Sequence, residues 1–243
     1  MIDFTGKNIL VMGLGLNQGG LGVARYVAQK GASVRITDLK TEAELQETMD
    51  SIKRDEVLKK SEFILGRHRE EDIDWADYVV KNPAVPVESP YIQYAYEIKV
   101  PVITEFEIFF DALRSKDGAR TIGVTGTRGK STTTALIYHL LRKVQDEPVY
   151  LVGNIRKSAL EILDELPEKA YICIEMSSFQ LELLKSSPDI AVFTSFFPDH
   201  LNRHHTMEEY FLAKSHIFLY QRPGGILIVN DDNHYLHHHL RAP

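Results

Sequence analysis

The sequence predicts an α/β fold of two domains, each built around a mainly parallel β-sheet covered by helices. Three observations lead to this prediction. Short apolar segments typical of buried strands alternate with segments of helical periodicity along the chain. A glycine-rich turn follows one such strand at residues 13–22, and a second follows another at residues 126–129. Each turn leads into a segment of helical periodicity, which is the layout of a phosphate-binding turn in parallel α/β domains.

The composition is that of an ordinary soluble globular protein. The 243 residues are 44% hydrophobic and 26% charged, which allows one large or two small domains. The net charge of −6 and the pI of about 5.9 provide no basic field for nucleic acid. No apolar stretch reaches the roughly 18 residues of a membrane span, the N-terminus has no signal-peptide core, and the single cysteine, Cys173, cannot form an intramolecular disulfide. We therefore expect a cytoplasmic protein without nucleic acid or membrane partners. A monomer is the expected state, although nothing in the sequence determines it.

Residues 1–105 are expected to form a small doubly wound, Rossmann-like domain. Its glycine-rich turn follows the first strand, and Asp38 ends the second, as in a nucleotide-binding βαβ unit. Asp38 is therefore placed to accept hydrogen bonds from a ribose or a base. The expected strands are residues 8–12, 33–37, 63–66, 77–80 and 101–104, with helical segments at 23–30, 41–60 and 90–97.

A nicotinamide dinucleotide is the minor alternative ligand for this domain. Gly13 and Gly15 match the G-x-G-x-x-G pattern, but position 18 is Gln, and the next glycines are Gly19 and Gly20. The turn is therefore longer than the dinucleotide pattern, which favours a different nucleotide ligand.

Residues 106–243 are expected to form a second domain that begins with a phosphate-binding loop (P-loop). A strand at residues 121–124 precedes the loop, and a helix at residues 133–143 follows it. Backbone N–H groups at a helix N-terminus favour an anion, Lys130 can reach the outer phosphates of a nucleotide, and the Ser131 hydroxyl can ligate Mg²⁺. The usual pattern has a glycine where this chain has Val124, so a capped glycine turn without phosphate binding is the alternative. The helix is predicted from apolar residues at helical spacing, namely Ala135, Leu136, Leu140 and Val144.

Further polar residues follow the other expected strands of this domain, which are residues 150–155, 171–176, 190–194 and 225–230, or lie in a helix at 207–220. Because a parallel sheet gathers strand-end residues on one side, we expect them to form one site. Glu175 and Ser131 suit Mg²⁺, and a histidine suits a second divalent ion. Taken singly, Glu175 is better interpreted as a helix-cap partner and His200 as an ordinary loop histidine, and it is their place after a phosphate-binding loop that favours a site. The gathered set is Lys130, Ser131, Asn154, Glu175, Asp199, His200 and Lys214.

Five separated segments resemble the Mur ligases of peptidoglycan synthesis, in the order found in that family. The segment 175–182, Glu-Met-Ser-Ser-Phe-Gln-Leu-Glu, is most similar to the members that add D-glutamate. Residues 13–16, Asp38 and the pair 82–83 look like the uridine-nucleotide domain of those members. The five segments are residues 125–133, 153–154, 175–182, 199–203 and 209–214.

The resemblance implies an ATP-dependent ligase. Such an enzyme phosphorylates the terminal carboxylate of UDP-N-acetylmuramoyl-L-alanine, and the amine of D-glutamate then attacks the acyl phosphate, giving ADP and phosphate. By the same resemblance, Lys130, His200 and Lys214 are catalytic. Two Mg²⁺ sites are implied, with Ser131, Glu175, His200 and a carbamylated Lys214 as ligands.

The resemblance also assigns two sets of binding residues. The ATP-binding set is Gly126, Thr127, Arg128, Gly129, Lys130, Ser131 and Thr132. The set that binds the UDP substrate is Gly15, Leu16, Asn17, Asp38, Leu39, Lys40, Asn82, Ala84 and Asn154.

The chain departs from the family pattern at several positions. Arg128 and Ser195 stand where asparagine is common, and Ala84 stands where glycine is common. The turn at residues 15–22 is longer, which weakens the transfer of a role to Asn17. Family members also carry a third domain that binds D-glutamate. The chain is therefore expected to be a fragment or a truncated form with an incomplete central domain.

Three other functions stay open on the sequence. One is a Mur-type ligase for another amino acid, which the segment Phe179-Gln180-Leu181 argues against. Another is a binding module for a UDP-sugar and ATP without turnover. The third is a plain P-loop phosphotransferase, which leaves the first domain and Lys214 unexplained. The histidine-rich segment at 234–239 is expected to be a solvated terminal stretch, because no cluster of cysteines or carboxylates at ligand spacing accompanies it.

Overall fold

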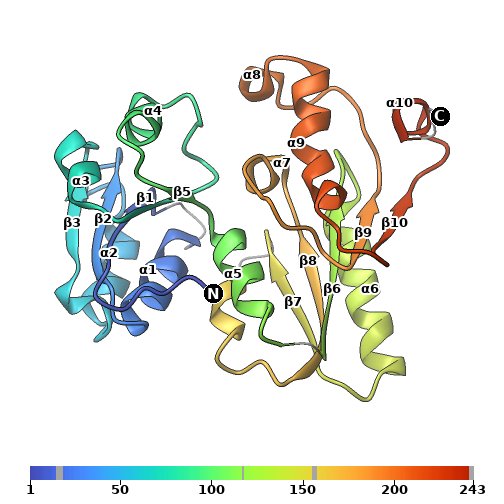
Figure 1. Ribbon diagram of the computed structural model, residues 1–243, viewed down its shortest axis with the longest axis horizontal. Coiled ribbons are helices and arrows are strands. Elements are labelled where there is room, and N and C mark those ends of the chain that lie inside the picture. The colour runs from blue at the N-terminus through green and yellow to red at the C-terminus, as the bar shows by residue number, and fades with distance from the viewer. Residues whose placement is uncertain (15–18, 117, 155–157, 241–243) are drawn as a thin grey trace. The chain divides into compact units, whose positions relative to one another are not determined.

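The computed structural model describes residues 1–14, 19–116, 118–154 and 158–240. The chain divides into two compact units (Figure 1). Unit 1 contains Met1–Asp111 together with Ser158–Glu161, and unit 2 contains Ala112–Lys157 and Ile162–Pro243. A short piece of chain far along the sequence therefore packs with the first unit.

Unit 1 is built on a five-stranded sheet in the order β3-β2-β1-β4-β5, with every pairing parallel. The order reverses between β1 and β4, and ligands of such sheets bind at that point, beyond the carboxyl ends of the strands. The strands are β1 (Asn8–Met12), β2 (Ser33–Asp38), β3 (Glu62–Leu65), β4 (Tyr78–Lys81) and β5 (Val102–Ile103).

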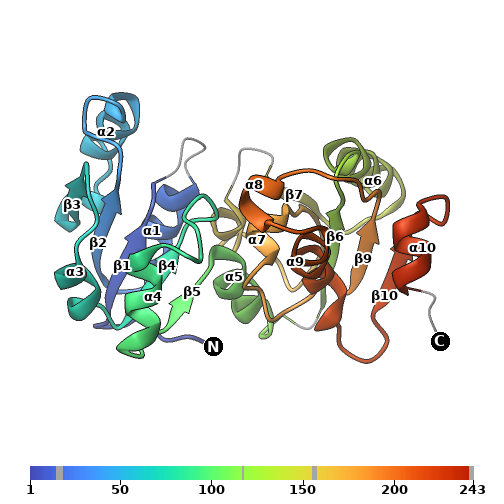
Figure 2. The same cartoon turned by 90° about the horizontal axis from the view of Figure 1, so that it is seen from above.

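Helices cover both faces of this sheet. Figure 2 shows α1 and α2 on one side and α3 and α4 on the other, as right-handed crossovers in opposite directions from the sheet centre require. The helices of this part of the chain are α1 (Gly19–Gln29), α2 (Gln46–Lys53), α3 (Glu70–Trp75), α4 (Pro90–Glu97) and α5 (Glu105–Leu113), with 3₁₀ turns η1 (Leu58–Lys60) and η2 (Ala159–Ile162).

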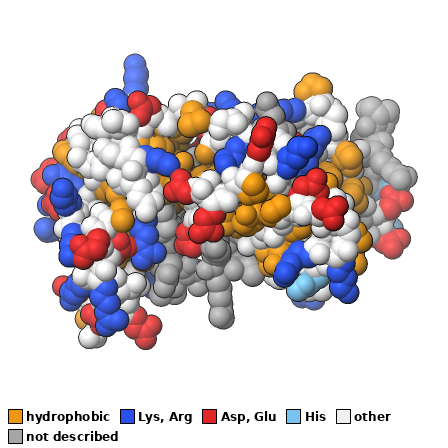
Figure 3. Space-filling view, turned by 90° about the horizontal axis from the view of Figure 1, so that it is seen from below, with side chains coloured by type: hydrophobic (Ala, Val, Ile, Leu, Met, Phe, Trp, Pro, Cys, Tyr) orange, Lys and Arg blue, Asp and Glu red, His pale blue; other side chains and the backbone are white. Residues whose placement is uncertain are grey.

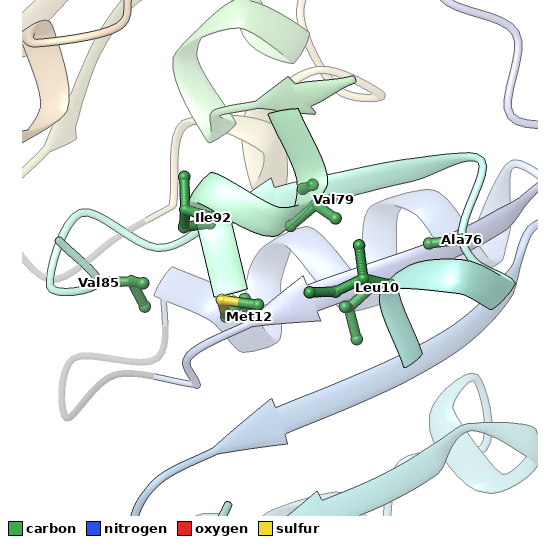
Figure 4. Close-up of a cluster of buried hydrophobic side chains, with 8 residues drawn as sticks. Leu10, Met12, Ala76, Val79, Val85 and Ile92 are labelled. Carbon is green, nitrogen blue, oxygen red and sulfur yellow. The ribbon is translucent and has the colours of Figure 1, made fainter. Parts of the chain in front are cut away.

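One core cluster of unit 1 lies between the sheet and the helices α3 and α4. Alternate residues of β1, Leu10 and Met12, point to the same face as Val79 of β4, because strand side chains alternate with a period of two. Ala76, Val85 of the loop before α4 and Ile92 of α4 complete the labelled part of the cluster (Figure 4). This packing fixes the carboxyl ends of β1 and β4 beside each other.

Unit 2 contains a second parallel five-stranded sheet, in the order β10-β9-β6-β8-β7. The two sheets confirm the predicted α/β class with mainly parallel strands. The strands are β6 (Gly118–Thr125), β7 (Val149–Gly153), β8 (Lys169–Glu175), β9 (Ile190–Phe193) and β10 (Ile226–Val229). The helices are α6 (Lys130–Val144), α7 (Ser178–Leu181), α8 (Leu201–His204), α9 (Met207–Leu219) and α10 (His234–Leu240).

Helix α6 differs from the prediction in which face it buries. Its predicted apolar positions Leu136, Leu140 and Val144 are 58%, 54% and 73% exposed. They recur every four residues and form a stripe on the outer side of the helix, whereas the residue that is fully buried is Thr134. The periodicity thus identified a helix correctly but not the side that packs on the sheet. Figure 2 shows α6 on the opposite face of this sheet from α9.

The described surface is mixed in charge. Figure 3 shows Lys and Arg side chains interspersed with Asp and Glu over the face that it displays. Among the described residues, no helix is both long enough and apolar enough to span a bilayer.

Candidate functional site

The candidate site of unit 2 is built on the loop between β6 and α6. Gly126 and Gly129 have positive φ angles of 147° and 86°, a region that L-residues with side chains rarely adopt. A Cβ atom at Gly126 would lie 2.1 Å from the Thr194 hydroxyl oxygen, so a side chain cannot fit there. The loop ends where α6 begins, at Lys130, so the free N–H groups of the first helical turn lie beside it.

The Lys130 side chain folds back over this loop. Its Nζ donates hydrogen bonds to the carbonyl oxygens of Gly126 (2.9 Å) and Thr127 (3.0 Å). Burial lowers the pKa of Lys130, and the charges of Glu175 and Asp199 oppose that shift. The ammonium group is therefore held beside the helix N-terminus, where it adds to the attraction for an anion.

A second lysine reaches the same loop from α9. Lys214 is 1% exposed, and its Nζ donates a hydrogen bond to the Gly126 carbonyl oxygen at 3.0 Å and lies 4.7 Å from the centre of the Tyr210 ring. Burial lowers the pKa of Lys214 from 10.5 to about 7, the charge of Lys130 contributes to the lowering, and Asp199 opposes it. A neutral amine is therefore well populated near pH 7.

Glu175 and Asn154 meet at the ends of neighbouring strands. Glu175 is the last residue of β8, is buried, and pairs in register with Val124 of β6. The backbone N–H of Asn154 donates to the Glu175 carbonyl oxygen at 3.2 Å, and its side-chain amide donates to Oε1 at 3.4 Å. The sequence argument that strand ends gather polar groups predicts this meeting.

Asp199 and His200 follow β9 in an exposed loop. The His200 backbone has a positive φ of 52°, and its N–H donates to Oδ1 of Asp199 at 2.9 Å. The imidazole Nε2 lies 3.6 Å from Oδ2 of Asp199, and the ring packs edge-on against Phe179. The charge of Asp199 acts on both Lys130 and Lys214. The loop after β9 therefore lies on the same side of the sheet as the phosphate-binding loop.

The side chains of this site would bind a metal ion only together with the phosphates of a bound nucleotide. Among the described residues, no three side chains of the His, Cys, Asp or Glu type are grouped closely enough to hold an ion. Ser131 and Thr132 lie exposed on the first turn of α6. Mg²⁺ commonly keeps several waters and binds through one or two carboxylates and substrate phosphates, so a single carboxylate such as Glu175 with a hydroxyl fits that ion.

The strand ends of unit 1 form a separate polar region. The Asp38 carboxylate accepts the backbone N–H of Leu14 at 2.9 Å through one oxygen and that of Lys40 at 2.9 Å through the other. Asp38 therefore ties the ends of β1 and β2 together, while Leu39 beside it is 65% exposed. The predicted residues Gly15, Leu16 and Asn17 lie outside the described residues.

Asn82 forms the other side of this region. Its side-chain oxygen accepts the N–H of Ala84 at 3.0 Å, an Asx turn that shapes the loop after β4. Gly13 has a φ of 91°, and a Cβ there would lie 2.9 Å from the Asn82 Cβ. The close approach of these two loops explains why the chain has glycine at position 13.

Sequence reasoning missed several residues that contact the phosphate-binding loop. Thr194 and Ser195 follow β9 directly and hydrogen-bond to the backbone of Arg128. The Tyr210 hydroxyl lies 3.4 Å from the Thr127 hydroxyl. Two signals were available in the sequence. Thr194 and Ser195 stand at a strand end next to the Asp199-His200 loop, and Ser195 stands where the family commonly has another polar residue, asparagine.

Comparison with curated proteins finds relatives with one shared name. UDP-N-acetylmuramoylalanine–D-glutamate ligase of Roseiflexus sp. (strain RS-1) is 43% identical over 96% of this chain and 48% of its own length. The protein of that name from Clostridioides difficile (strain 630) is 34% identical over 96% of this chain and 49% of its own length. The chain thus spans about half the length of the curated relatives it matches.

Solved structures share the fold at low identity. The UDP-N-acetylmuramate:L-alanyl-gamma-D-glutamyl-meso-diaminopimelate ligase of Neisseria meningitides matches with a TM-score of 0.60 and 15% identity, over 96% of this chain and 74% of that one. A murein peptide ligase of Psychrobacter arcticus matches with a TM-score of 0.50 and 16% identity, over 96% of this chain and 51% of that one. At these identities the likeness concerns the fold.

Domain families match both units. Residues 7–104 match the MurD-like N-terminal domain of Mur ligases, and residues 124–242 match the Mur ligase middle domain. The two matches follow each other in the chain as the two sheets do, and the chain belongs to the Mur ligase family.

Proposed function

We propose that this chain is the substrate- and ATP-binding part of a ligase that adds D-glutamate to UDP-N-acetylmuramoyl-L-alanine. The observation that carries the proposal is the phosphate-binding loop, whose Gly126 carbonyl accepts hydrogen bonds from both Lys130 and Lys214. The choice of D-glutamate rests on the name of the relatives at 34–43% identity. Because the chain spans about half of those relatives, the complete reaction is part of the proposal.

In this proposal unit 2 binds ATP and Mg²⁺. The loop residues 126–132 surround the phosphates, Lys130 neutralises the outer phosphates, and the first-turn N–H groups of α6 face them. ATP would supply the phosphoryl group that converts a poor electrophile, the substrate carboxylate, into one that an amine can attack. Ser131 and Glu175 would hold one Mg²⁺, and His200 with Lys214 would hold a second, since two approaching anions need their charge neutralised.

Lys214 can serve a cation only after modification. An ammonium group repels a metal ion. When the neutral amine instead attacks CO₂, an N–C bond forms and an N–H proton is released to solvent, which leaves an anionic carbamate with the oxygen donors that hard divalent ions prefer. The burial of Lys214 and the neighbouring Lys130 favour the neutral amine, because both lower its pKa. We therefore assign a carbamylated Lys214 to the second metal position.

Unit 1 binds the UDP substrate in this proposal. Asp38, Leu39 and Lys40 would meet the uracil, with the exposed Leu39 side chain available for an apolar contact. Because both oxygens of Asp38 already accept backbone N–H groups, we assign to Asp38 the shaping of this loop in addition to any ligand contact. The diphosphate and sugar would contact the loops at Asn82 and Ala84, with Gly15, Leu16 and Asn17 as further predicted contacts of this unit. Asn154, which the resemblance also assigns to the UDP substrate, lies in unit 2.

Substitution of Lys130 tests the binding of ATP and the binding of the UDP substrate separately. Lys130→Ala should weaken MgATP binding by at least about tenfold, the effect of losing roughly 1.4 kcal/mol of interaction, and leave UDP-N-acetylmuramoyl-L-alanine binding unchanged. Isothermal titration calorimetry of each ligand measures both. Lys143→Ala, an exposed lysine in the last turn of α6, is the control. Unchanged ATP affinity in Lys130→Ala, or tighter binding of NAD(H) than of the UDP substrate by the unmodified chain, would contradict the proposal.

A further inference from the structure

The carboxyl end of β9 is joined to the phosphate-binding loop by a set of hydrogen bonds that the proposed chemistry does not use. We infer that Ser195, assisted by Thr194, is a positioning residue that holds this loop in its nucleotide-binding conformation. The inference rests on the proposed ATP site, and it adds to that site two residues whose hydroxyl groups bind the backbone of the loop.

Ser195 binds both polar groups of one loop residue. Its Oγ accepts the backbone N–H of Arg128 at 2.9 Å and donates to the Arg128 carbonyl oxygen at 3.0 Å. Its own carbonyl oxygen accepts the N–H of Thr127 at 2.7 Å. One serine thus satisfies three backbone groups of Thr127 and Arg128, which form the apex of the loop. These groups have no partner within a helix or strand.

Thr194 supports the same apex from the preceding position. Its backbone N–H donates to the Thr125 carbonyl oxygen at 2.9 Å, which extends the pairing of β9 with β6 by one residue. Its hydroxyl lies 2.6 Å from the Arg128 carbonyl oxygen and 3.1 Å from that of Thr125. A hydroxyl has one hydrogen to donate, and the shorter contact is the one to Arg128.

The loop has no room to move toward β9. A Cβ atom at Gly126 would lie 2.1 Å from the Thr194 hydroxyl and 2.9 Å from the Ser195 nitrogen. The Thr127 hydroxyl also accepts the Phe197 N–H at 3.0 Å, so the segment that follows Ser195 is bonded to the loop as well. Both sides of the loop apex are therefore fixed to the strand end before any ligand arrives.

The hydrogen bonds also decide which N–H groups face a phosphate. The N–H groups of Thr127 and Arg128 are directed to Ser195, so they are committed to the protein. The first N–H with an intrahelical partner in α6 is that of Thr133, which donates to Gly129 at 2.9 Å. In the proposed ATP site, the phosphates would therefore meet the N–H groups of the first helical turn, at residues 130–132. A loop that is already ordered loses less conformational freedom on binding.

Amide hydrogen exchange tests the contact itself, without a ligand. In Ser195→Ala the Arg128 N–H loses its acceptor, so its exchange should accelerate at least about tenfold. The Thr127 N–H should keep its protection, because its acceptor is the backbone carbonyl of residue 195. Ser187→Ala is the matched control, since its hydroxyl donates to the His216 carbonyl at 2.7 Å before the start of β9. Unchanged exchange at Arg128 would overturn the inference.

Nucleotide affinity tests what the contact is for. We expect MgATP to bind about tenfold more weakly to Ser195→Ala and to the isosteric Thr194→Val, with UDP-substrate binding unchanged. Ser195→Thr, which keeps the hydroxyl, should bind MgATP within about twofold of the unmodified chain. Equal MgATP affinity of Ser195→Ala and the unmodified chain overturns the inference.

The two assays also separate this inference from the proposed function. If the unmodified chain binds no MgATP, the proposed function fails and the positioning of the loop for ATP fails with it, even where exchange at Arg128 responds. If the unmodified chain binds MgATP but Ser195→Ala changes neither affinity nor exchange, only the positioning role is wrong.

Discussion

At the scale of single residues, two lysine side chains donate to one backbone carbonyl. Nζ of Lys130 and Nζ of Lys214 lie 2.9 and 3.0 Å from the Gly126 oxygen. Two ammonium groups so close repel each other, and the more buried of them is expected to lose its proton first. The pKa values agree, because that of Lys214 falls to about 7 while the pKa of Lys130 is lowered less far by its partial burial. In the proposed function, the charged member of this pair serves the phosphate and the neutral member reacts with CO₂.

Carbamate formation at Lys214 gives a direct spectroscopic test. With ¹³C-bicarbonate at pH 8, where a pKa of about 7 leaves most of the amine neutral, we expect a carbamate ¹³C resonance in the unmodified chain. The resonance should be absent in Lys214→Met and should fade as the pH falls below about 7, because the amine becomes protonated. Lys185→Met, an exposed lysine, is the control. A carbamate signal that persists in Lys214→Met would contradict the assignment.

His216 makes the stability of the fold depend on pH. Burial lowers the pKa of this histidine from 6.5, with a partial offset from the carbonyls of Leu181 and Leu184, and among the described residues its Nδ1 has no hydrogen-bond partner. A histidine with a lowered folded pKa stabilises the fold above its unfolded pKa and loses that contribution as the pH falls through the folded pKa. The free energy of unfolding should therefore decrease from pH 7 to pH 5.

Matched glutamine variants isolate this contribution. His216→Gln should flatten the pH dependence of urea unfolding between pH 7 and pH 5, while His139→Gln, at an exposed position of α6, should leave it as in the unmodified chain. The buried His68 stays in both variants, and burial lowers its pKa as well, so the slope should decrease without vanishing. An unchanged slope in His216→Gln would show that the ring is hydrated in the fold.

At the scale of elements, the start of α1 shows which glycine of the first turn is structural. A Cβ at Gly20 would lie 2.2 Å from the Gly13 carbonyl oxygen, whereas one at Gly19 would have its nearest neighbour at 3.8 Å. The Gly20 N–H also donates to the Leu14 carbonyl at 3.0 Å. The helix therefore begins at a backbone contact with the strand end, and the sequence pattern left Gly19 and Gly20 as equal candidates.

Alanine at each position gives opposite expectations. Gly20→Ala should lower the free energy of unfolding by about 1–3 kcal/mol, because a backbone atom would have to move to admit the methyl group. Gly19→Ala should be neutral or stabilise by up to about 1 kcal/mol, as alanine is favoured over glycine in helices. Urea denaturation followed by circular dichroism measures both. Equal effects of the two substitutions would mean that the contact at Gly20 relaxes without cost.

At the scale of the whole molecule, a late segment of the chain returns to unit 1. Ser158 Oγ and the Ala159 N–H donate to one carboxyl oxygen of Glu105 at 2.6 and 2.8 Å. Gly22 of α1 packs against Ser158 so closely that a Cβ there would lie 2.5 Å from the serine Cβ. Burial raises the pKa of Glu105, and these two hydrogen bonds oppose the shift. The first unit thus depends on residues that lie after the phosphate-binding loop in sequence.

Two substitutions of Glu105 should distinguish the effect of its charge on stability from the effect of its hydrogen bonds. A carboxyl group with a raised folded pKa stabilises the fold at low pH and loses that contribution as the pH rises through the folded pKa. Glu105→Gln keeps an acceptor without a charge, so at pH 8 it should be at least as stable as the unmodified chain. Glu105→Ala leaves the Ser158 and Ala159 donors unpaired and should cost about 1–3 kcal/mol. Calorimetric unfolding at pH 5 and pH 8 checks both, and a large loss in Glu105→Gln at pH 8 would show that the carboxylate itself is needed.

The order of elements and the location of the loop could be read from the sequence. Apolar segments and glycine turns are local features, and predicted elements such as β1 (Asn8–Met12) and α4 (Pro90–Glu97) coincide closely with those in the structure. The helix predicted at 41–60 is wrong in extent, because the structure has α2 (Gln46–Lys53) and the 3₁₀ turn η1 (Leu58–Lys60) there. The strand-end argument also predicted that Asn154 and Glu175 would meet, because parallel strands present their carboxyl ends on one side. Local pattern is sufficient where the relevant contacts follow from strand direction.

Only the tertiary structure decided which distant residues touch the loop. Lys214 reaches Gly126 from 88 positions away, and Ser195 reaches Arg128 from 67 positions away. These contacts depend on β9 lying beside β6, and strand order is set by long-range packing that local periodicity does not encode. Burial is decided in the same way. The apolar stripe of α6 faces outward while the polar side chain of Lys214 is enclosed, because the position of each helix over the sheet determines which of its faces is covered.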